Sequence, residues 1–413
     1  MNDMRNIMVG YELNNTEAQI SYFDYKNMEP ITLSTVVGTK KYQIPTVICK
    51  KTGEDIWYYG REAIYFSQQK EGVLVQDLFT LCYEGKEVEI EGVKYSGVKL
   101  LSIFISLSFT LLKNLGTVDQ IKGITFTSKE VETPYIHAIQ GAMELLNFDR
   151  KRYFIQDHKE SFYYFIMNQK KELWSHEVYY FEFEKDKIKT YNLRINRKYL
   201  PMIVSVEELE DLGLGKDPSH HDEIFYQYLQ KLFYKKVVTS IFLIGEDFHQ
   251  SWAPKSTEFM CKGRKVFLGQ NLYSKGACYG VREKLEEKIL RDFFYNGENM
   301  LHVNVGIDMT VRGITSYYSL IEAGVNWYEA YHRCEFILDD TEEVILQFDT
   351  VDKKSSQCII HLDGLPKRPN KATRVALSVM FLDSNTCKIT VEDLGLGMLY
   401  LATNKKWEQV VTI

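Results

Sequence analysis

The sequence predicts an α/β region of about 295 residues followed by an all-β region that begins near residue 300. In the first region, short runs of β-branched and aromatic residues alternate with segments whose apolar residues recur at helical spacing. After Met300 the helical spacing disappears, and short alternating runs such as EVILQFDTV and CKITVEDLG remain. A chain of 413 residues exceeds what one hydrophobic core usually serves, so we expect two or three domains.

The chain opens with a predicted hairpin, in which the polar turn NNTE (14–17) joins strands at 7–13 and 18–25. Two more strand-like runs flank the turn KKTG (50–53), and a loop-like segment follows. A helix is predicted over 95–115, where apolar residues recur at helical spacing, and we expect it to be buried because its apolar run, 98–112, is too short for a membrane span. The next predicted elements are a strand at 123–127, a helix at 131–146 and a strand at 152–156.

The remaining α/β elements follow the same alternation. We expect a helix at 161–170, a hairpin around the turn EKDK (184–187), a helix at 220–236 and an apolar strand at 237–244. A last helix, predicted at 281–296, closes this region.

Charge and cysteine usage narrow the function classes. The net charge of −6 gives no reason to expect binding to nucleic acid or to a membrane surface. The seven cysteines are scattered without a CxxC pair, which favours free thiols in a reducing cytoplasm over disulfides or a zinc site. The N-terminal residues lack the pattern of a secretory signal, so we expect a cytoplasmic protein.

Three segments in order suggest a family. The hairpin VGYELNNTEAQISYFD, the run that begins GITFTSKEVETPYIHAIQ, and TSIFLIGEDFHQSWAPKSTEFM with QNLYSKGACYGV resemble the actin-like and sugar-kinase-like ATPases, especially the seventy-kilodalton heat-shock chaperones. The later run from SLIEAGVNWYEAYHR to CKITVEDLG resembles the β-sandwich substrate domain of those chaperones.

The resemblance implies a two-lobed actin-like (ribonuclease-H-like) nucleotide domain at 1–295, followed by a β-sandwich at 300–413. Lobe I would span about 1–170 and lobe II about 171–295. We expect a lidless relative of these chaperones, because nothing after Ile413 would supply the helical lid of the family.

ATPases of this family hold phosphates with the backbone amides of two Gly-rich hairpins, and a carboxylate on each hairpin helps to hold magnesium. Here Glu12 matches the first carboxylate, Asn14 and Asn15 stand where glycine and threonine are expected, and Thr16 is retained. The second hairpin begins at Glu182 and contains no glycine.

Added carboxylates disfavour a phosphate, since a like-charge contact costs on the order of 1 to 4 kcal/mol. The family's catalytic glutamate and proline align with His158 and Lys159. We therefore expect a pseudo-ATPase that does not hydrolyse ATP.

On the adenosine side the resemblance assigns Gly245, Glu246 and Gly280, with Glu246 in place of a second glycine. Gly245 can equally be the end of a strand and nothing more. The resemblance leaves ATP or ADP with Mg²⁺ as the only cofactor to consider, bound weakly for want of phosphate contacts.

Other polar clusters favour structural readings. The run HHDE (220–223) could ligate a metal, but the preceding DPS (217–219) is a helix-start signal and favours capping. Ser161 near Asp157 and His158 lacks a nucleophile elbow. The segments DLGLG (211–215) and GLG (395–397) are predicted to be turns. A basic patch forms a solvated loop or meets an acidic partner; its residues are Lys367, Arg368, Lys371 and Arg374.

The function expected from these features is that of a non-hydrolysing, chaperone-like binding or adaptor protein that engages a polypeptide segment. A β-sandwich can accept an extended segment at a strand edge, and residues 320–347 would lie nearest such a groove. One alternative is a slow Mg-dependent ATPase that uses Glu12, Thr16 and Glu182. Another is a structural subunit of a cytoplasmic assembly.

Overall fold

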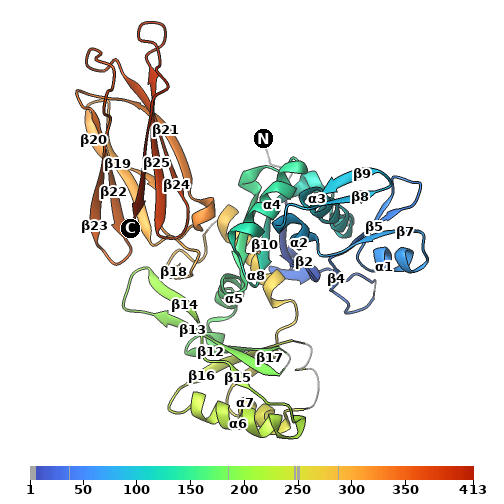
Figure 1. Ribbon diagram of the computed structural model, residues 1–413. Helices are drawn as coiled ribbons and strands as arrows, with labels where there is room; N and C mark the ends of the chain where they lie inside the picture. The colour runs from blue at the N-terminus through green and yellow to red at the C-terminus, as the bar shows by residue number, and fades with distance from the viewer. Residues whose placement is uncertain (1–5, 37, 185, 246–247, 249–251, 287) are drawn as a thin grey trace. The chain divides into compact units, whose positions relative to one another are not determined.

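The computed structural model describes residues 6–36, 38–184, 186–245, 248, 252–286 and 288–413. The chain forms two compact units, Met1–Phe294 and Tyr295–Ile413 (Figure 1). The first unit contains both helices and strands, and the second is built almost entirely of strands. The expected order of an α/β region followed by a β-rich region is therefore confirmed.

The first unit contains two large sheets with the same strand order. The first sheet runs β11-β10-β1-β2-β3, with β4 attached to β2. Strands β1, β10 and β11 are mutually parallel, whereas β2 is antiparallel to β1, β3 and β4. Its strands are β1 (Ile7–Leu13), β2 (Glu17–Asp24), β3 (Glu29–Thr32), β4 (Ile44–Pro45), β10 (Ile121–Ser128) and β11 (Tyr153–Asp157).

The second sheet runs β17-β16-β12-β13-β14-β18, with β15 attached to β13. Here too a central hairpin, β12 and β13, is flanked on one side by parallel strands. Both sheets thus consist of consecutive antiparallel strands followed by two parallel crossover strands. The strands are β12 (Glu177–Glu184), β13 (Lys187–Asn196), β14 (Met202–Glu208), β15 (Leu212–Gly213), β16 (Val238–Ile244), β17 (Lys265–Leu268) and β18 (Phe293–Tyr295).

Two helices, α5 (His158–Met167) and α8 (Leu272–Leu285), link the sheets and pack on each other. Glycine makes these contacts close. A Cβ on Gly276 would lie 1.9 Å from the backbone oxygen of Ser161, and one on Gly10 would lie 2.0 Å from that of Ser274. Because backbone atoms cannot yield, α8 can pack on β1 and α5 only with glycine at these positions.

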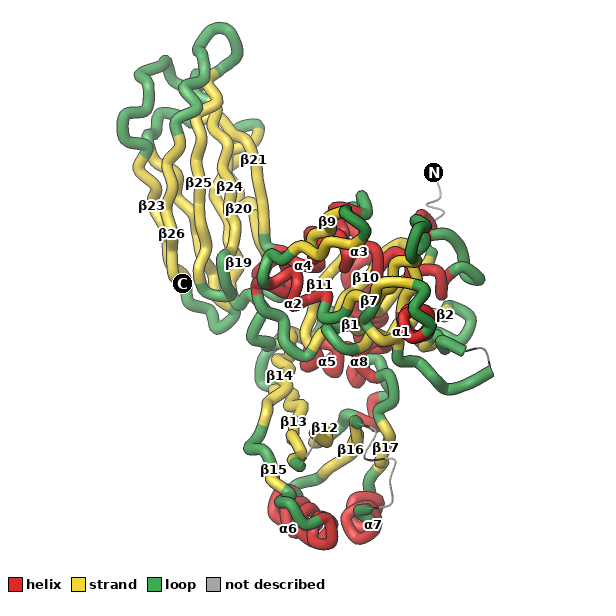
Figure 2. The backbone as a smooth tube through the Cα atoms, turned by 45° about the vertical axis from the view of Figure 1, so that its right-hand side comes forward, coloured by secondary structure: helices red, strands yellow, loops and turns green. Residues whose placement is uncertain are grey.

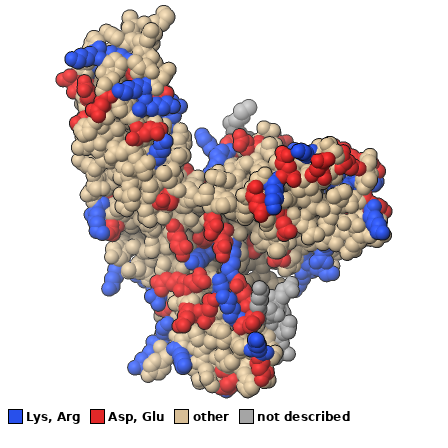
Figure 3. Space-filling view, in the orientation of Figure 1, with Lys and Arg blue, Asp and Glu red and all other residues tan. Residues whose placement is uncertain are grey.

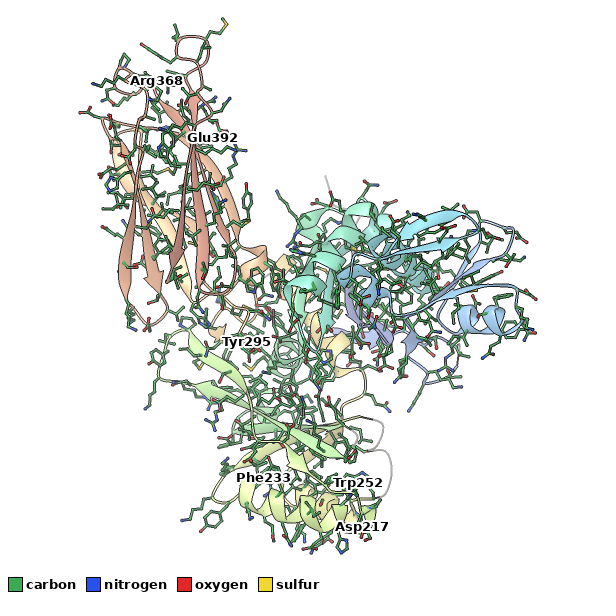
Figure 4. The ribbon with its side chains drawn as sticks, viewed as in Figure 1. Asp217, Phe233, Trp252, Tyr295, Arg368 and Glu392 are labelled. Atoms are coloured by element: carbon green, nitrogen blue, oxygen red, sulfur yellow. The ribbon has the colours of Figure 1, made fainter. Side chains whose placement is uncertain are left out.

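Helices also cover the outer faces of the two sheets. On the first sheet, the Tyr11 hydroxyl bonds to Ser108 of α3 (Gly97–Ser108), and α4 (Thr133–Leu145) packs on α3. On the second sheet, α6 (His221–Leu232) and α7 (Pro254–Cys261) lie side by side (Figure 2). Phe233 and Trp252 belong to the core beneath them (Figure 4).

Between β4 and β10 the chain forms a small layer of its own, in which two strands flank the turn at 50–53 as predicted, and short helices and strands stand in place of the loop expected after them. The layer is packed through aromatic contacts such as Tyr58 on Phe66 and Trp57 on Tyr95. The pattern of one short run of sequence does not predict such contacts. The elements are β5 (Ile48–Lys51), β6 (Trp57–Tyr59), α1 (Gly60–Gln68), β7 (Gly72–Val75), α2 (Leu78–Tyr83), β8 (Glu87–Ile90) and β9 (Val93–Ser96).

The helix predicted at 281–296 is wrong. Helix α8 spans Leu272–Leu285, and residues 293–295 form a strand. The Glu283 carboxylate accepts hydrogen bonds from the backbone N–H groups of Ile289 and Leu290, at 3.1 and 2.7 Å. These bonds hold a turn just after the helix ends.

The second unit is a sandwich of two antiparallel sheets, β20-β19-β22-β23 and β21-β24-β25-β26, that share one hydrophobic core. Inward residues alternate with outward ones, as in β25, where burial alternates at every position. The strands are β19 (Val303–Val311), β20 (Ile314–Ile321), β21 (Tyr331–Ile337), β22 (Glu343–Thr350), β23 (Ser355–His361), β24 (Arg374–Phe381), β25 (Thr386–Gly395) and β26 (Lys406–Thr412).

Candidate functional site

Two backbone N–H groups of the β1–β2 turn are already bonded within the turn. The Asn14 side-chain oxygen accepts hydrogen bonds from the Thr16 N–H at 2.9 Å, the Thr16 hydroxyl at 2.8 Å and the Glu17 N–H at 3.0 Å. A phosphate held in this turn would need those same N–H groups. The turn is therefore closed by a side chain at the place where the family resemblance puts an anion.

The Asn15 side chain is bonded to residues at and near the start of α2. Its amide donates to Asp77 and Thr80, each at 3.1 Å, and its oxygen accepts from the Phe79 N–H at 3.0 Å. These bonds attach the hairpin to the start of α2.

A network of six polar side chains joins the first sheet to the second and is called here the inter-sheet network. It consists of Glu12, Lys129, His158, Glu182, Glu184 and Tyr273, which come from β1, the end of β10, the start of α5, β12 and the start of α8. Glu12 and Glu182, which sequence reasoning singled out, both belong to it. Lys129, His158 and Tyr273 had not been given a role of this kind.

Contacts within the network follow one another without a break. Glu12 Oε1 lies 3.4 Å from His158 Nε2, and the His158 ring stacks on Tyr273 with ring centroids 3.7 Å apart. The Tyr273 hydroxyl donates to Glu182. Lys129 donates to Glu182 at 3.2 Å and also to Glu184.

Burial sets the charge states at one end of the network. It raises the pKa of Glu12 to about 8, with further raising by the nearby Glu17 and Glu182 carboxylates. Burial also lowers the pKa of His158 to about 3, with Lys129 adding to the effect. At pH 7 the Glu12 carboxyl is therefore largely protonated and the His158 imidazole is neutral, so this end offers little charge to a magnesium ion.

The residues assigned to adenosine have separate structural neighbours. Gly245 has φ of +113° and follows β16, where an added Cβ would lie 3.2 Å from the Phe183 backbone oxygen. Gly280 lies within α8, where a Cβ would lie 2.6 Å from Gln156 Oε1 and 3.1 Å from Tyr164. Glu246 lies outside the described residues.

The second unit contains a groove of about 1070 Å³ at one end of the sandwich. Its walls come from the far half of β19 and the first half of β22, and its floor includes Phe336 and Leu338. Part of the predicted range 320–347 lines it, as does 307–313, which sequence reasoning did not single out.

A family model, "Family of unknown function (DUF5716) C-terminal", matches residues 29–298, which is more than half of the chain. The chain belongs to this DUF5716 C-terminal family. A second model, "Domain of unknown function (DUF8552)", matches residues 300–413. No curated protein matches the sequence.

The DUF5716 match contains five members of the inter-sheet network and begins after Glu12. Lys129 was visible in the sequence as one lysine after an apolar strand, and Tyr273 as one tyrosine among 28. A single chain shows no signal that would pair them with Glu182. The DUF8552 match covers the whole groove.

The cluster at 220–223 in the DUF5716 region is a capping site. The Asp222 carboxylate accepts from the N–H groups of Lys255 and Ser256, at 2.8 and 2.9 Å, at the start of α7. Asp217 accepts from the Ser219 N–H at 3.0 Å, as the helix-start reading predicted. Among the described residues, no group of three His, Cys, Asp or Glu side chains is arranged to hold a metal.

Within the described part of the chain, no helix is long and apolar enough to cross a membrane.

Proposed function

We propose that the protein is a non-hydrolysing, chaperone-like binding protein that engages an extended polypeptide segment through its second unit. The observation that carries the proposal is the groove of about 1070 Å³ at one end of the sandwich. Its lining combines apolar side chains with strand backbone, the combination that recognises extended chains.

The first unit is, in this proposal, an actin-like scaffold. Supporting it are the repeated strand order of its two sheets and the paired helices α5 and α8 that link them. A duplicated sheet of this kind is what the resemblance to the chaperone ATPases leads us to expect.

The inter-sheet network supports the absence of hydrolysis. The stacked rings of His158 and Tyr273 lie between Glu12 of the first hairpin and Glu182 of the second, and Lys129 is already paired with two carboxylates. A triphosphate placed there would meet Glu182 and Glu184 and would have to displace the lysine that neutralises them. We also propose a cytoplasmic location, which the seven free cysteines support.

Isothermal titration of the full-length chain tests the nucleotide part. We expect no saturable heat with ATP or ADP in the presence of Mg²⁺ up to millimolar concentration. Saturable binding tighter than about 1 mM, or phosphate release, would favour the slow ATPase instead.

Panning a random dodecapeptide display library on the immobilised full-length chain tests the polypeptide part. We expect enrichment of sequences with apolar residues at alternate positions. An unenriched library would contradict the proposal.

A further inference from the structure

One sheet of the second unit is split. Strand β19 pairs with β20 from Val305 to Val311, but it pairs with β22 only from Val303 to Gly306. Strand β22 continues to pair with β23 as far as Glu343. Residues 307–311 of β19 and 343–346 of β22 therefore face each other without a ladder, and this gap is called here the fork.

The apex of the fork has a defined construction. Gly306 lies opposite Gln347 in the last paired position, and the Gln347 side-chain amide donates to Asp308 at 2.6 Å. A Cβ on Gly306 would lie 2.2 Å from the Tyr317 ring, so that ring covers the glycine. The paired residues, 303–306 of β19 and 347–350 of β22, end at this hydrogen bond. They hold in place the two arms of the fork, which are residues 307–311 and 343–346.

The fork differs from an ordinary sheet edge because two strands, β19 and β22, each present an unpaired edge to the same gap. A strand edge carries unpaired N–H and C=O groups, which pair readily with another extended chain. In the fork, one inserted strand could satisfy both arms. Since β19 and β22 run antiparallel, the inserted strand would be antiparallel to one arm and parallel to the other.

Size and lining fit a short extended segment. The five residues 307–311 span roughly 17 Å at about 3.3 Å per residue, so about five residues of a partner would fit. Phe336 and Val344 supply apolar surface inside the groove. Ile345, 41% exposed, and Ile337, 48% exposed, extend that surface to the opening.

The charged residues that line the groove indicate which residue types the bound segment has at its ends. Four carboxylates line the groove, those of Asp308, Glu335, Asp339 and Glu343, and they outnumber Lys371 and Arg374. Both cations are already paired, Lys371 with Asp339 at 3.2 Å and Arg374 with Glu335 at 3.5 Å. Both signs are visible on the upper part of the second unit (Figure 3). Of the other two carboxylates, Asp308 accepts from Gln347 and Glu343 lies 2.9 Å from His361 Nδ1. Because neither is paired with a lysine or an arginine among the described residues, they favour a segment that has lysine or arginine at its ends.

We propose that the fork accepts a segment of about five residues from a partner polypeptide as an additional strand of the β19–β22 sheet. The segment has apolar side chains at alternate positions and basic residues at its ends. This inference rests on the proposed polypeptide-binding function and adds to it the site, the backbone conformation and the charge of the partner.

The probe is a fluorescein-labelled peptide, KVTVTVK, and binding to the full-length chain is measured by fluorescence anisotropy. A second peptide carries N-methyl groups on alternate amides, which remove hydrogen-bond donors and keep the side chains. A third carries glutamate in place of both lysines. We expect binding of the first peptide and at least about tenfold weaker binding of each of the other two.

Two matched variants locate the site. Ile345 and Ile359 lie opposite each other on β22 and β23 and are 41% and 43% exposed, but only Ile345 lines the groove. We expect Ile345→Asp to weaken binding of KVTVTVK at least about tenfold and Ile359→Asp to change it less than about threefold. Circular dichroism and thermal unfolding of both variants establish that they fold.

The outcomes separate the inference from the proposed function. Equal binding of the N-methylated peptide, or equal effects of the two isoleucine variants, would overturn strand addition in the fork. Peptides enriched by panning that bind Ile345→Asp normally would overturn the fork and leave polypeptide binding intact. If neither KVTVTVK nor any panned peptide bound the unmodified chain, both would fail.

Discussion

The inter-sheet network of the first unit and the fork of the second unit differ in whether their hydrogen-bonding groups already have partners within the chain. In the first unit, groups that the family resemblance assigns to a ligand are bonded to neighbouring side chains: the turn amides donate to Asn14, and Glu182 of the inter-sheet network accepts from Lys129 and Tyr273. In the fork, strand backbone and apolar side chains that could be paired within the sheet are left open. The comparison teaches that a retained motif position is a poor guide to binding unless its hydrogen-bonding groups are also free.

The largest expected effect tests whether a closed polar cluster carries stability in the second unit as well. Arg368 donates to Asp393 at 2.7 and 2.8 Å, with the two side chains 5% and 0% exposed. Arg368→Leu leaves a buried carboxylate without its charge partner, so we expect a loss of about 3 to 5 kcal/mol in the free energy of unfolding. Urea unfolding of the full-length chain measures it.

Arg374→Leu is the control. Arg374 pairs with Glu335 at 3.5 Å, and both side chains are 45% exposed, so we expect a loss of less than about 1 kcal/mol. Comparable losses for the two variants would show that burial of the Arg368 pair contributes nothing special.

The next effect concerns pH and the first unit. Glu12 has a folded pKa of about 8 against an ordinary 4.5, so its proton favours the folded state and stability falls as pH rises between these values. His158 has a folded pKa of about 3 against an ordinary 6.5, so stability rises with pH over that interval. The two trends oppose each other between 4.5 and 6.5, and Glu12 alone acts between 6.5 and 8.

We therefore expect the first unit to lose about 2 kcal/mol of stability between pH 6.5 and 8. Glu12→Gln, which removes the titrating group and keeps the shape, should flatten this decline. Chemical denaturation at several pH values measures both chains. A decline of the same steepness in Glu12→Gln would mean that another group causes it.

The smallest effect tests the closed turn. Asn14→Ala removes the acceptor for three hydrogen bonds, and because the site is largely exposed we expect a loss of only about 1 kcal/mol. Asn14→Asp keeps the acceptor and should lose less. Thermal unfolding compares the variants, and a larger loss in Asn14→Asp would contradict this account.

The same pair of variants can break the comparison. Asn14→Ala frees the turn amides but leaves Tyr273 and His158 in place, so we expect no gain of MgATP binding by isothermal titration. A gain would show that Asn14, rather than the inter-sheet network, excludes the nucleotide.

Much of the fold was predictable where local pattern and tertiary packing agree. The hairpin at the start of the chain, the strand at residues 121–128 and the helix that follows it were expected within a few residues. The prediction fails at α8. The buried residues of this helix lie at 272–281 and the helix ends at Leu285, whereas a helix was predicted over the charged stretch 281–296. The short elements from α1 to β9, where a loop was expected, were missed because their contacts join segments that have weak patterns separately.

The sequence by itself determined the α/β region and the β-rich region, and it placed Asn14, Asn15 and an acidic second hairpin where the family resemblance expects a glycine, a threonine and a glycine run, because periodicity and residue type are local properties. Only the tertiary structure decided that Glu12, His158, Tyr273 and Glu182 meet, since they come from four elements joined by packing across two sheets. The tertiary structure alone decided the fork as well. Which strands pair, and where their pairing stops, depends on backbone geometry between segments that are distant in the sequence.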